Sequence, residues 1–257
     1  MKKIFSILLA VLTIGCFGME AKTTKKSAKK KAASSSVVVT KGETKQYGDY
    51  LTTQIFNASK GKNKKLTLEY PVSGNQQLVD SIRQYLVGNI PGASNLLDNP
   101  EQLLKKYPNL NQGSSRDEFE ETAVIIFSNP NIISYTVEGY IQEYGINYPY
   151  LRDWGNTFML EDGTSFYHAG DPINSKLYPY LIRYINKCED NEYAKECYRE
   201  QINEDGFGGY LFITEEGLEF REQNYNLPEY INKIFRGAIP ISEIYDLFPP
   251  EKQKFFN

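Results

Sequence analysis

The chain has 257 residues, of which 40% are apolar and 24% are charged, and this balance excludes a collagen-like, a fully disordered and a polytopic membrane protein. Residues 1–45 hold 10 of the 29 basic residues and 2 of the 32 acidic ones, so the remainder carries a net charge of −11. Such an acidic body argues against a nucleic-acid-binding protein, which needs a basic face.

Residues 1–21 have the features of an export signal. A basic start at Lys2-Lys3 precedes an apolar run from Ile4 to Ile14, and small residues follow it. At about 1.5 Å per residue, this run is too short to cross a hydrocarbon layer about 30 Å thick. We therefore expect an exported protein and no stable membrane span.

The end of this signal allows two kinds of processing. The chain is cleaved near Gly18 or Ala21, or Thr13-Ile14-Gly15-Cys16 acts as a lipobox and Cys16 receives a lipid. In both cases the predicted location is extracytoplasmic: periplasmic, an outer-membrane lipoprotein, or secreted. Contact with a membrane is expected only through the lipid anchor.

Residues 22–65 are predicted to be a disordered, Lys-rich linker. Six Lys stand among Thr, Ser and Ala in residues 22–31, the first acid of the segment is Glu43, and such a composition buries too little apolar surface to fold. The segment suits a solubilising tether or a polycation that rests on anionic lipid or cell-wall polymer. The folded domain is expected to span residues 66–250.

The first part of this domain combines a strand with helices. Leu66 to Tyr70 alternates as a short strand before the breaker Pro71, and Asn75 to Val87 has apolar residues at helical spacing. Ser115-Arg116-Asp117-Glu118 matches a capping box and predicts a second helix, with Phe119, Ala123 and Ile126 on one face.

Strands are clearest between Ile132 and Gly163. Apolar residues from Ile133 to Ile141 share one parity and polar residues share the other, which predicts an antiparallel strand with one core face and one solvated face. A second strand is expected near Trp154 to Leu160, and a later hairpin joins Tyr210–Thr214 to Leu218–Glu222. The predicted fold is therefore α+β: an antiparallel sheet built from hairpins and packed with helices, in a single compact domain.

The later hairpin belongs to a longer pattern. Residues 212–220 read Phe-Ile-Thr-Glu-Glu-Gly-Leu-Glu-Phe, followed by Tyr225–Tyr230 and then by Ala-Ile-Pro-Ile-Ser-Glu-Ile at 238–244. Together with the upstream strands, residues 66–248 resemble the C-terminal domain of unknown function found in the anti-sigma factor RsiV.

The resemblance implies an extracytoplasmic sensor domain that binds lysozyme. Only Met1 to Lys3 precede the apolar run, so we do not expect the cytoplasmic segment that holds a sigma factor in that family. For this chain the resemblance implies a stand-alone, bacterial, exported binding domain that needs no cofactor. Its expected partner is lysozyme, another envelope protein or a glycan.

The sequence contains no recognisable catalytic motif. His168 is the only histidine, which excludes a site with two histidine ligands to one metal, and no Gly-x-Ser-x-Gly occurs. We interpret His168 as a loop residue, and we predict neither an enzyme nor a metal site. Two alternatives stay open: an envelope hydrolase acting on glycan or peptidoglycan through an unlocated carboxylate pair, and a structural envelope protein.

Aromatic density suggests a binding surface. Tyrosine and tryptophan give large contact areas at a low cost in rotamer entropy, and they also stack on sugar rings. The predicted partner-binding residues cluster within 15 positions: Tyr140, Tyr144, Tyr148, Tyr150 and Trp154. The alternative is that another part of the chain covers this face.

Two cysteines remain in the predicted domain. Cys188 and Cys197 are nine residues apart, and in one continuous helix their Cα atoms would be about 13 Å apart, which is too far for a disulfide. A turn at residues 189–191 would bring two helices together as a hairpin. Because an exported protein meets an oxidising environment, we predict a Cys188–Cys197 disulfide.

Overall fold

The computed structural model describes residues 36–88, 90–168, 171, 173–188, 191–204, 206–223 and 234–256. The predicted signal peptide with Cys16, residues 22–35 of the predicted linker, and the stretch Tyr225–Tyr230 lie outside these described residues. In the part of the chain that is described, no helix is long and apolar enough to cross a membrane.

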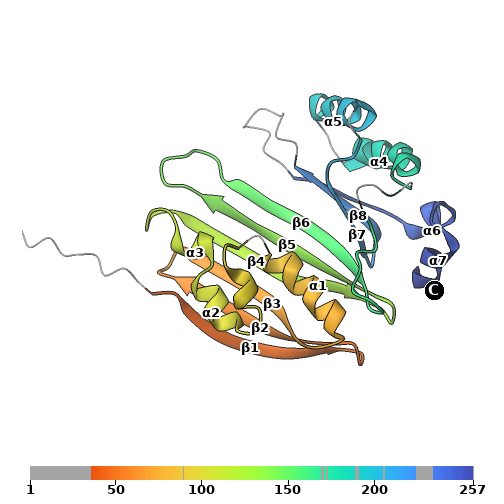
Figure 1. The fold of residues 1–257 in the computed structure, drawn as a ribbon. Coiled ribbons are helices and arrows are strands. Elements are labelled where there is room, and N and C mark those ends of the chain that lie inside the picture. Colours follow the sequence, from red (N-terminus) through yellow and green to blue (C-terminus); the bar gives the residue numbers. More distant parts are fainter. Residues whose placement is uncertain are drawn as a thin grey trace, which may run out of the picture. The chain divides into compact units, whose positions relative to one another are not determined.

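The larger of two sheets has six strands, and its spatial order follows the chain (Figure 1). The strands are β1 (Val38–Tyr47), β2 (Leu51–Lys60), β3 (Lys64–Gly74), β4 (Glu118–Ser128), β5 (Ile132–Gln142) and β6 (Tyr150–Met159). Neighbouring strands are antiparallel except β3 and β4, which are parallel. The parallel pair arises because the chain crosses over through helices between these two strands.

The crossover covers one face of this sheet. It consists of α1 (Gln76–Val87), η1 (Ala93–Asn95), α2 (Pro100–Lys105) and α3 (Pro108–Asn111), which lie together over the strands in Figure 1. Leu78 and Ile82 of α1 pack with Ile133, Tyr135 and Phe158 of the sheet in one buried cluster. The predicted helix Asn75–Val87 is confirmed, and Asn75 caps it by accepting hydrogen bonds from the amides of Gln77 and Leu78.

A second sheet forms from the C-terminal part of the chain. Its three antiparallel strands are β7 (Tyr210–Thr214), β8 (Gly217–Gln223) and β9 (Ile234–Ile239). It shares a hydrophobic core with α4 (Asn174–Cys188), α5 (Glu192–Glu204) and the short helices α6 (Ile241–Ile244), η3 (Tyr245–Leu247) and η4 (Lys254–Phe256). The short helix α7 (Pro250–Gln253) lies between η3 and η4 in the chain. The predicted β7–β8 hairpin is confirmed.

A buried ion cluster joins the two sheets. Arg221 of β8 is 4% exposed, and it donates hydrogen bonds to Glu138 Oε1 at 2.7 Å and to Asp153 of β6. Its Nε also donates to Glu219 at 2.6 Å, and Arg236 of β9 lies 2.5 Å from Asp153 Oδ2. Because Asp153 has no exposed side-chain surface, its charge is compensated by Arg221 and Arg236 and not by solvent.

Close backbone approach completes this junction. A Cβ on Gly155 would lie 2.3 Å from the ring of Phe212, so glycine is required where β7 crosses β6. The amide of Ile213 donates to Thr157 Oγ1 at 2.8 Å. The face of β5 and β6 that carries these contacts is therefore covered by the second sheet.

This covering corrects the prediction that β5 has one solvated face. Ser134 and Thr136, on the parity expected to face water, are buried, since β7 and β8 pack against the neighbouring strand. The alternation of apolar and polar residues along β5 reveals which side chains are polar, but not what they contact. The hydroxyl of Ser134 forms a hydrogen bond with Thr157 and not with solvent.

The linker prediction is wrong for residues 38–60, which form β1 and β2. Leu51, Phe56 and Ala58 are buried, whereas β1 is an edge strand of mostly exposed, polar side chains. Because the side chains of β1 are mostly exposed, polar residues suffice there, and its composition resembles that of a linker.

The helix predicted from Ser115 is also wrong, because residues 118–128 form β4. Asp117 does not cap a helix: its carboxylate accepts from the amides of Ser114 and Tyr144. Phe119, Glu121 and Ala123 are buried at a period of two, which is the pattern of a strand. The predicted α+β class in one domain is confirmed, with a mixed larger sheet.

Candidate functional site

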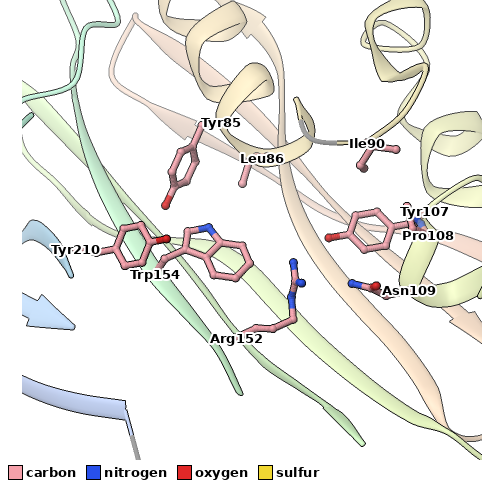
Figure 2. Close-up of a pocket in the computed structure, with 9 residues that line it drawn as sticks. All are labelled: Tyr85, Leu86, Ile90, Tyr107, Pro108, Asn109, Arg152, Trp154 and Tyr210. Atoms are coloured by element: carbon pink, nitrogen blue, oxygen red, sulfur yellow. The ribbon is translucent and has the colours of Figure 1, made fainter. Parts of the chain in front are cut away.

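A cavity of about 520 Å³ lies at the free edge of β6, where the helices of the crossover meet the larger sheet (Figure 2). Its lining comes from four separate parts of the chain. The residues are Tyr85, Leu86, Ile90, Tyr107, Pro108, Asn109, Arg152, Trp154 and Tyr210. The volume is within the usual range for sites that hold small ligands.

Local structure positions the helical side of this lining. Tyr85 and Leu86 lie in the last turn of α1, on the same side of the helix as the buried Leu78 and Ile82, and they pack against that buried cluster. Tyr107 is the N-cap residue of α3, and Pro108 occupies the first helical position, where its missing amide hydrogen costs nothing. Both aromatic side chains are thus held by short, well-defined helix ends.

A hydrogen-bonded network fixes the sheet side. Glu121 of β4 is 2% exposed; one of its carboxylate oxygens accepts from the hydroxyl of Tyr107 and the other from Nε of Arg152. The guanidinium carbon of Arg152 lies 4.7 Å from the centre of the Trp154 ring, a cation–π contact. Glu121 therefore orients both a phenol and a guanidinium at the cavity.

The two helical tyrosines stay protonated. Burial, and then the charge of Glu121, raise the pKa of Tyr107 far above its usual value, and burial raises the pKa of Tyr85 in the same way. The Tyr85 hydroxyl is buried without a hydrogen-bond partner among the described residues, and Figure 2 shows it pointing toward Tyr210 and Trp154. A buried hydroxyl of this kind favours a ligand that supplies its missing partner.

A second cavity, of about 290 Å³, continues along β6. It shares Arg152, Trp154 and Tyr210 with the first, so these three residues separate two parts of one groove. Its remaining lining residues come from β6, α5, β8 and the segment before β7: Tyr150, Leu151, Asp153, Gln201, Gly208, Gly209 and Glu222.

The larger cavity offers groups that can contact a ligand by stacking and by hydrogen bonding. It presents aromatic rings, phenolic hydroxyls, the Asn109 amide and a guanidinium, while both oxygens of Glu121 already accept hydrogen bonds. Within the described ranges, no group of three or more His, Cys, Asp and Glu residues could hold a metal ion.

The structure brings together only two of the five predicted binding residues. Tyr150 and Trp154 lie on β6 at alternating positions and line the groove. Tyr140 pairs with Leu151, whereas Trp154 pairs with Val137, so Tyr140 belongs to the opposite face of the sheet.

The other two predicted residues lie in the loop between β5 and β6. Tyr144 is 64% exposed and stacks under Arg116, whose guanidinium carbon lies 4.7 Å from the ring centre. Tyr148 is also exposed. Neither residue lines the groove.

Sequence reasoning missed Tyr85, Tyr107, Arg152 and Tyr210. Tyr85 has the spacing of a core residue of its helix, and nothing near Tyr107 in the sequence indicates a site. Arg152 and Trp154, two positions apart on a strand, were the available signal, because such residues lie on one face and can stack.

The remaining candidates from the sequence are His168 and the two cysteines of the predicted disulfide. His168 is an exposed residue after β6, and its amide donates to Asp171 at 3.2 Å. The helix break needed for a Cys188–Cys197 disulfide is present between α4 and α5. Cys197 carries a free thiol here, and the side chain of Cys188 lies outside the described residues, so the disulfide stays a prediction.

These features define an α+β module with an aromatic-lined groove at a sheet edge. No family model and no curated protein matches the chain. Among solved structures, it is similar to a member of the DUF3298 family from Bacteroides fragilis, with 13% identity, a TM-score of 0.48, and coverage of 82% of this chain and 93% of the other. A DUF3298 family protein from Pseudomonas aeruginosa has 9% identity, a TM-score of 0.47, and coverage of 85% and 96%. Similarity at this level is too weak to transfer a function.

Proposed function

We propose that this chain is an extracytoplasmic binding domain of the RsiV type, acting in the bacterial cell envelope without catalysis. The supporting observation is the aromatic cavity of about 520 Å³ at the edge of β6, with Arg152 and Tyr107 held in place by the buried Glu121. A site whose side chains are fixed before the ligand arrives loses less entropy on binding.

The proposed ligand is a glycan of the envelope or a protruding part of an envelope protein such as lysozyme. Trp154 and Tyr210 offer ring faces for stacking, and the Tyr85 hydroxyl next to them offers a hydrogen bond; the Asn109 amide adds hydrogen-bonding groups on the Tyr107 side of the cavity. Ring faces beside polar groups suit a sugar, which has apolar C–H faces and polar hydroxyl edges.

Trp154 makes this proposal directly testable, because it is the only tryptophan of the chain. We expect soluble peptidoglycan fragments to change its fluorescence emission in a saturable way. Replacing Tyr210, which is 48% exposed, by Ala should weaken this binding about tenfold by removing a ring face at little cost to the fold. Calorimetry with lysozyme as titrant tests the protein partner without relying on fluorescence.

Tyr144→Ala is the matched control, since this exposed tyrosine lies outside the groove. If Tyr144→Ala weakens binding and Tyr210→Ala does not, the β5–β6 loop and not the groove is the binding surface. If both variants bind every probe as the natural chain does, the proposed site is wrong.

The proposed location has its own test in the mass of the mature protein. We expect the mature chain to begin at Cys16 with a diacylglyceryl group, or between Met19 and Lys22 without one, because the apolar run after Lys3 suits a signal peptidase. Mass spectrometry of protein from the envelope fraction distinguishes the two. A mature protein that retains Met1 and stays in the cytoplasm would falsify export.

A further inference from the structure

The smaller cavity contains acceptor atoms that lack donors. Glu222 of β8 is 3% exposed, and its Oε1 accepts a hydrogen bond from Gln201 Nε2 at 2.7 Å. Its Oε2 has no hydrogen-bond partner among the described residues, and neither has Oε1 of Gln201. Because the amide nitrogen of Gln201 must be the group that donates to the carboxylate, its oxygen is left as a second acceptor beside Glu222.

Glu222 differs from the other deeply buried carboxylates in the described part of the chain. Three of these form ion pairs: Glu69 with Lys45, Glu121 with Arg152, and Asp153 with Arg221. Glu222 forms none among the described residues. A buried charge without a counter-charge is costly, so a carboxylate kept there favours a cation from outside.

The surroundings suit a cation that carries N–H groups. The rings of Tyr150, Trp154 and Tyr210 line the same cavity, and aromatic faces attract cations. Arg152 also lines it, but its Nε is bound to Glu121 and its guanidinium lies against Trp154. The volume of about 290 Å³ is at the lower end for ligand sites, which limits the occupant to a group the size of one side chain.

We propose that the cavity between Glu222, Gln201 and Tyr210 binds a protonated primary amine or a guanidinium group. An ammonium or guanidinium supplies the missing positive charge together with several N–H donors, for Glu222 Oε2 and Gln201 Oε1. The group can belong to a small molecule or to a Lys or Arg side chain. The inference extends the proposed function to the second half of the groove, and its test does not depend on the first half.

The experiment is an NMR titration of the whole mature chain with n-butylammonium and with methylguanidinium. The amides of Gly208 and Gly209, which line the cavity, serve as reporters. We expect saturable shifts of these two amides with a roughly millimolar Kd, as is usual for a probe of so few atoms. Preference for one of the two probes distinguishes ammonium from guanidinium, and titration with N-acetyl-lysine amide tests whether a peptide side chain can enter.

Variants and control probes decide between this binding and a general salt effect. Glu222→Gln and Gln201→Met should each weaken n-butylammonium binding at least tenfold, whereas Glu216→Gln, the same change in the exposed β7–β8 turn, should leave it unaltered. Tetramethylammonium, which lacks N–H donors, and neutral n-butanol should bind more weakly than n-butylammonium. The proposal is overturned if n-butanol shifts the two amides equally, or if Glu222→Gln binds n-butylammonium as before.

The outcome is separable from that of the proposed function. Failure of n-butylammonium to bind, with peptidoglycan fragments still changing Trp154 fluorescence, would remove the cation site alone. Loss of the fluorescence response with n-butylammonium still bound would instead remove the proposed glycan site.

Discussion

Replacing Arg221 by Met is expected to lower the free energy of unfolding by about 3–5 kcal/mol at pH 7, as is usual when one member of a buried ion pair is removed. Arg221 is 4% exposed, and Asp153 and Glu219 depend on it for compensation. Without it, Arg236, which is itself 47% exposed, is the one ion-pair partner that Asp153 keeps among the described residues. Since Arg221 also joins β8 to β5 and β6, its loss should loosen the edge that carries Trp154.

Urea denaturation followed by circular dichroism measures this change, and the emission of Trp154 reports the groove. Arg183→Met is the matched control, because Arg183 pairs with Glu243 at the surface and such pairs contribute about 1 kcal/mol or less. Combining Arg221→Met with Asp153→Leu should recover much of the lost stability, because the fully buried charge of Asp153 is then removed together with its partner. A cost below about 1 kcal/mol for Arg221→Met would contradict the ion cluster as the junction of the two sheets.

Replacing Glu222 by Gln is expected to stabilise the protein at pH 8 and to change little at pH 5. Burial raises the pKa of Glu222 from 4.5 to about 7, although a hydrogen bond from the Gly208 amide opposes this. Between pH 4.5 and about pH 7, Glu222 keeps its proton in the folded state but has lost it in the unfolded state. The free energy of unfolding therefore falls as the pH rises through this window. At 1.36 kcal/mol for each pH unit, the full loss is about 3 kcal/mol, and the Gln variant avoids it.

Chemical denaturation at several pH values between 5 and 8 tests this expectation, with Glu216→Gln as the exposed control. The difference between the natural chain and the Glu222→Gln variant isolates Glu222 from the other charged groups near it, Arg152 and Asp153 of β6. Gln201, the hydrogen-bond partner of Glu222, does not titrate. Parallel stability curves for the two proteins would show that Glu222 is ionised in the folded state throughout.

A carboxylate that destabilises the fold at neutral pH is informative about function. Its replacement by Gln keeps the hydrogen bond from Gln201, so the shape of the cavity does not require an acid. Residues that break a rule of stability are commonly functional. The stability measurement and the amine titration therefore examine the same residue by independent means.

The elements that the sequence predicted correctly are those specified by residues close together in the sequence. The helix at 76–87 follows from apolar spacing and the Asn75 cap, and the β7–β8 hairpin follows from a turn at Glu215-Glu216 between two apolar runs. These signals are local, because a cap or a turn involves residues only a few positions apart.

The tertiary structure decided where the predicted elements and residues lie. Ser134 and Thr136 were expected to face water, but the second sheet, contributed by residues 210–239, covers them. The polar composition of β1 predicts a linker, because its residues acquire a strand partner through β2, which the composition does not reveal. Polarity in sequence does not reveal which later segment will pack on a face.

The sequence by itself determined the α+β class, the amphipathic helix, the hairpins and, within a run of aromatics, two residues that line the groove, Tyr150 and Trp154. Only the tertiary structure decided the site, because its lining comes from residues 85–90, 107–109, 152–154 and 210, which no local pattern connects. The pairing of Glu121 with Tyr107 and Arg152, and the isolation of Glu222, are properties of contacts between distant segments. Local periodicity reports which residues share a face of one element, whereas a cavity depends on which elements meet.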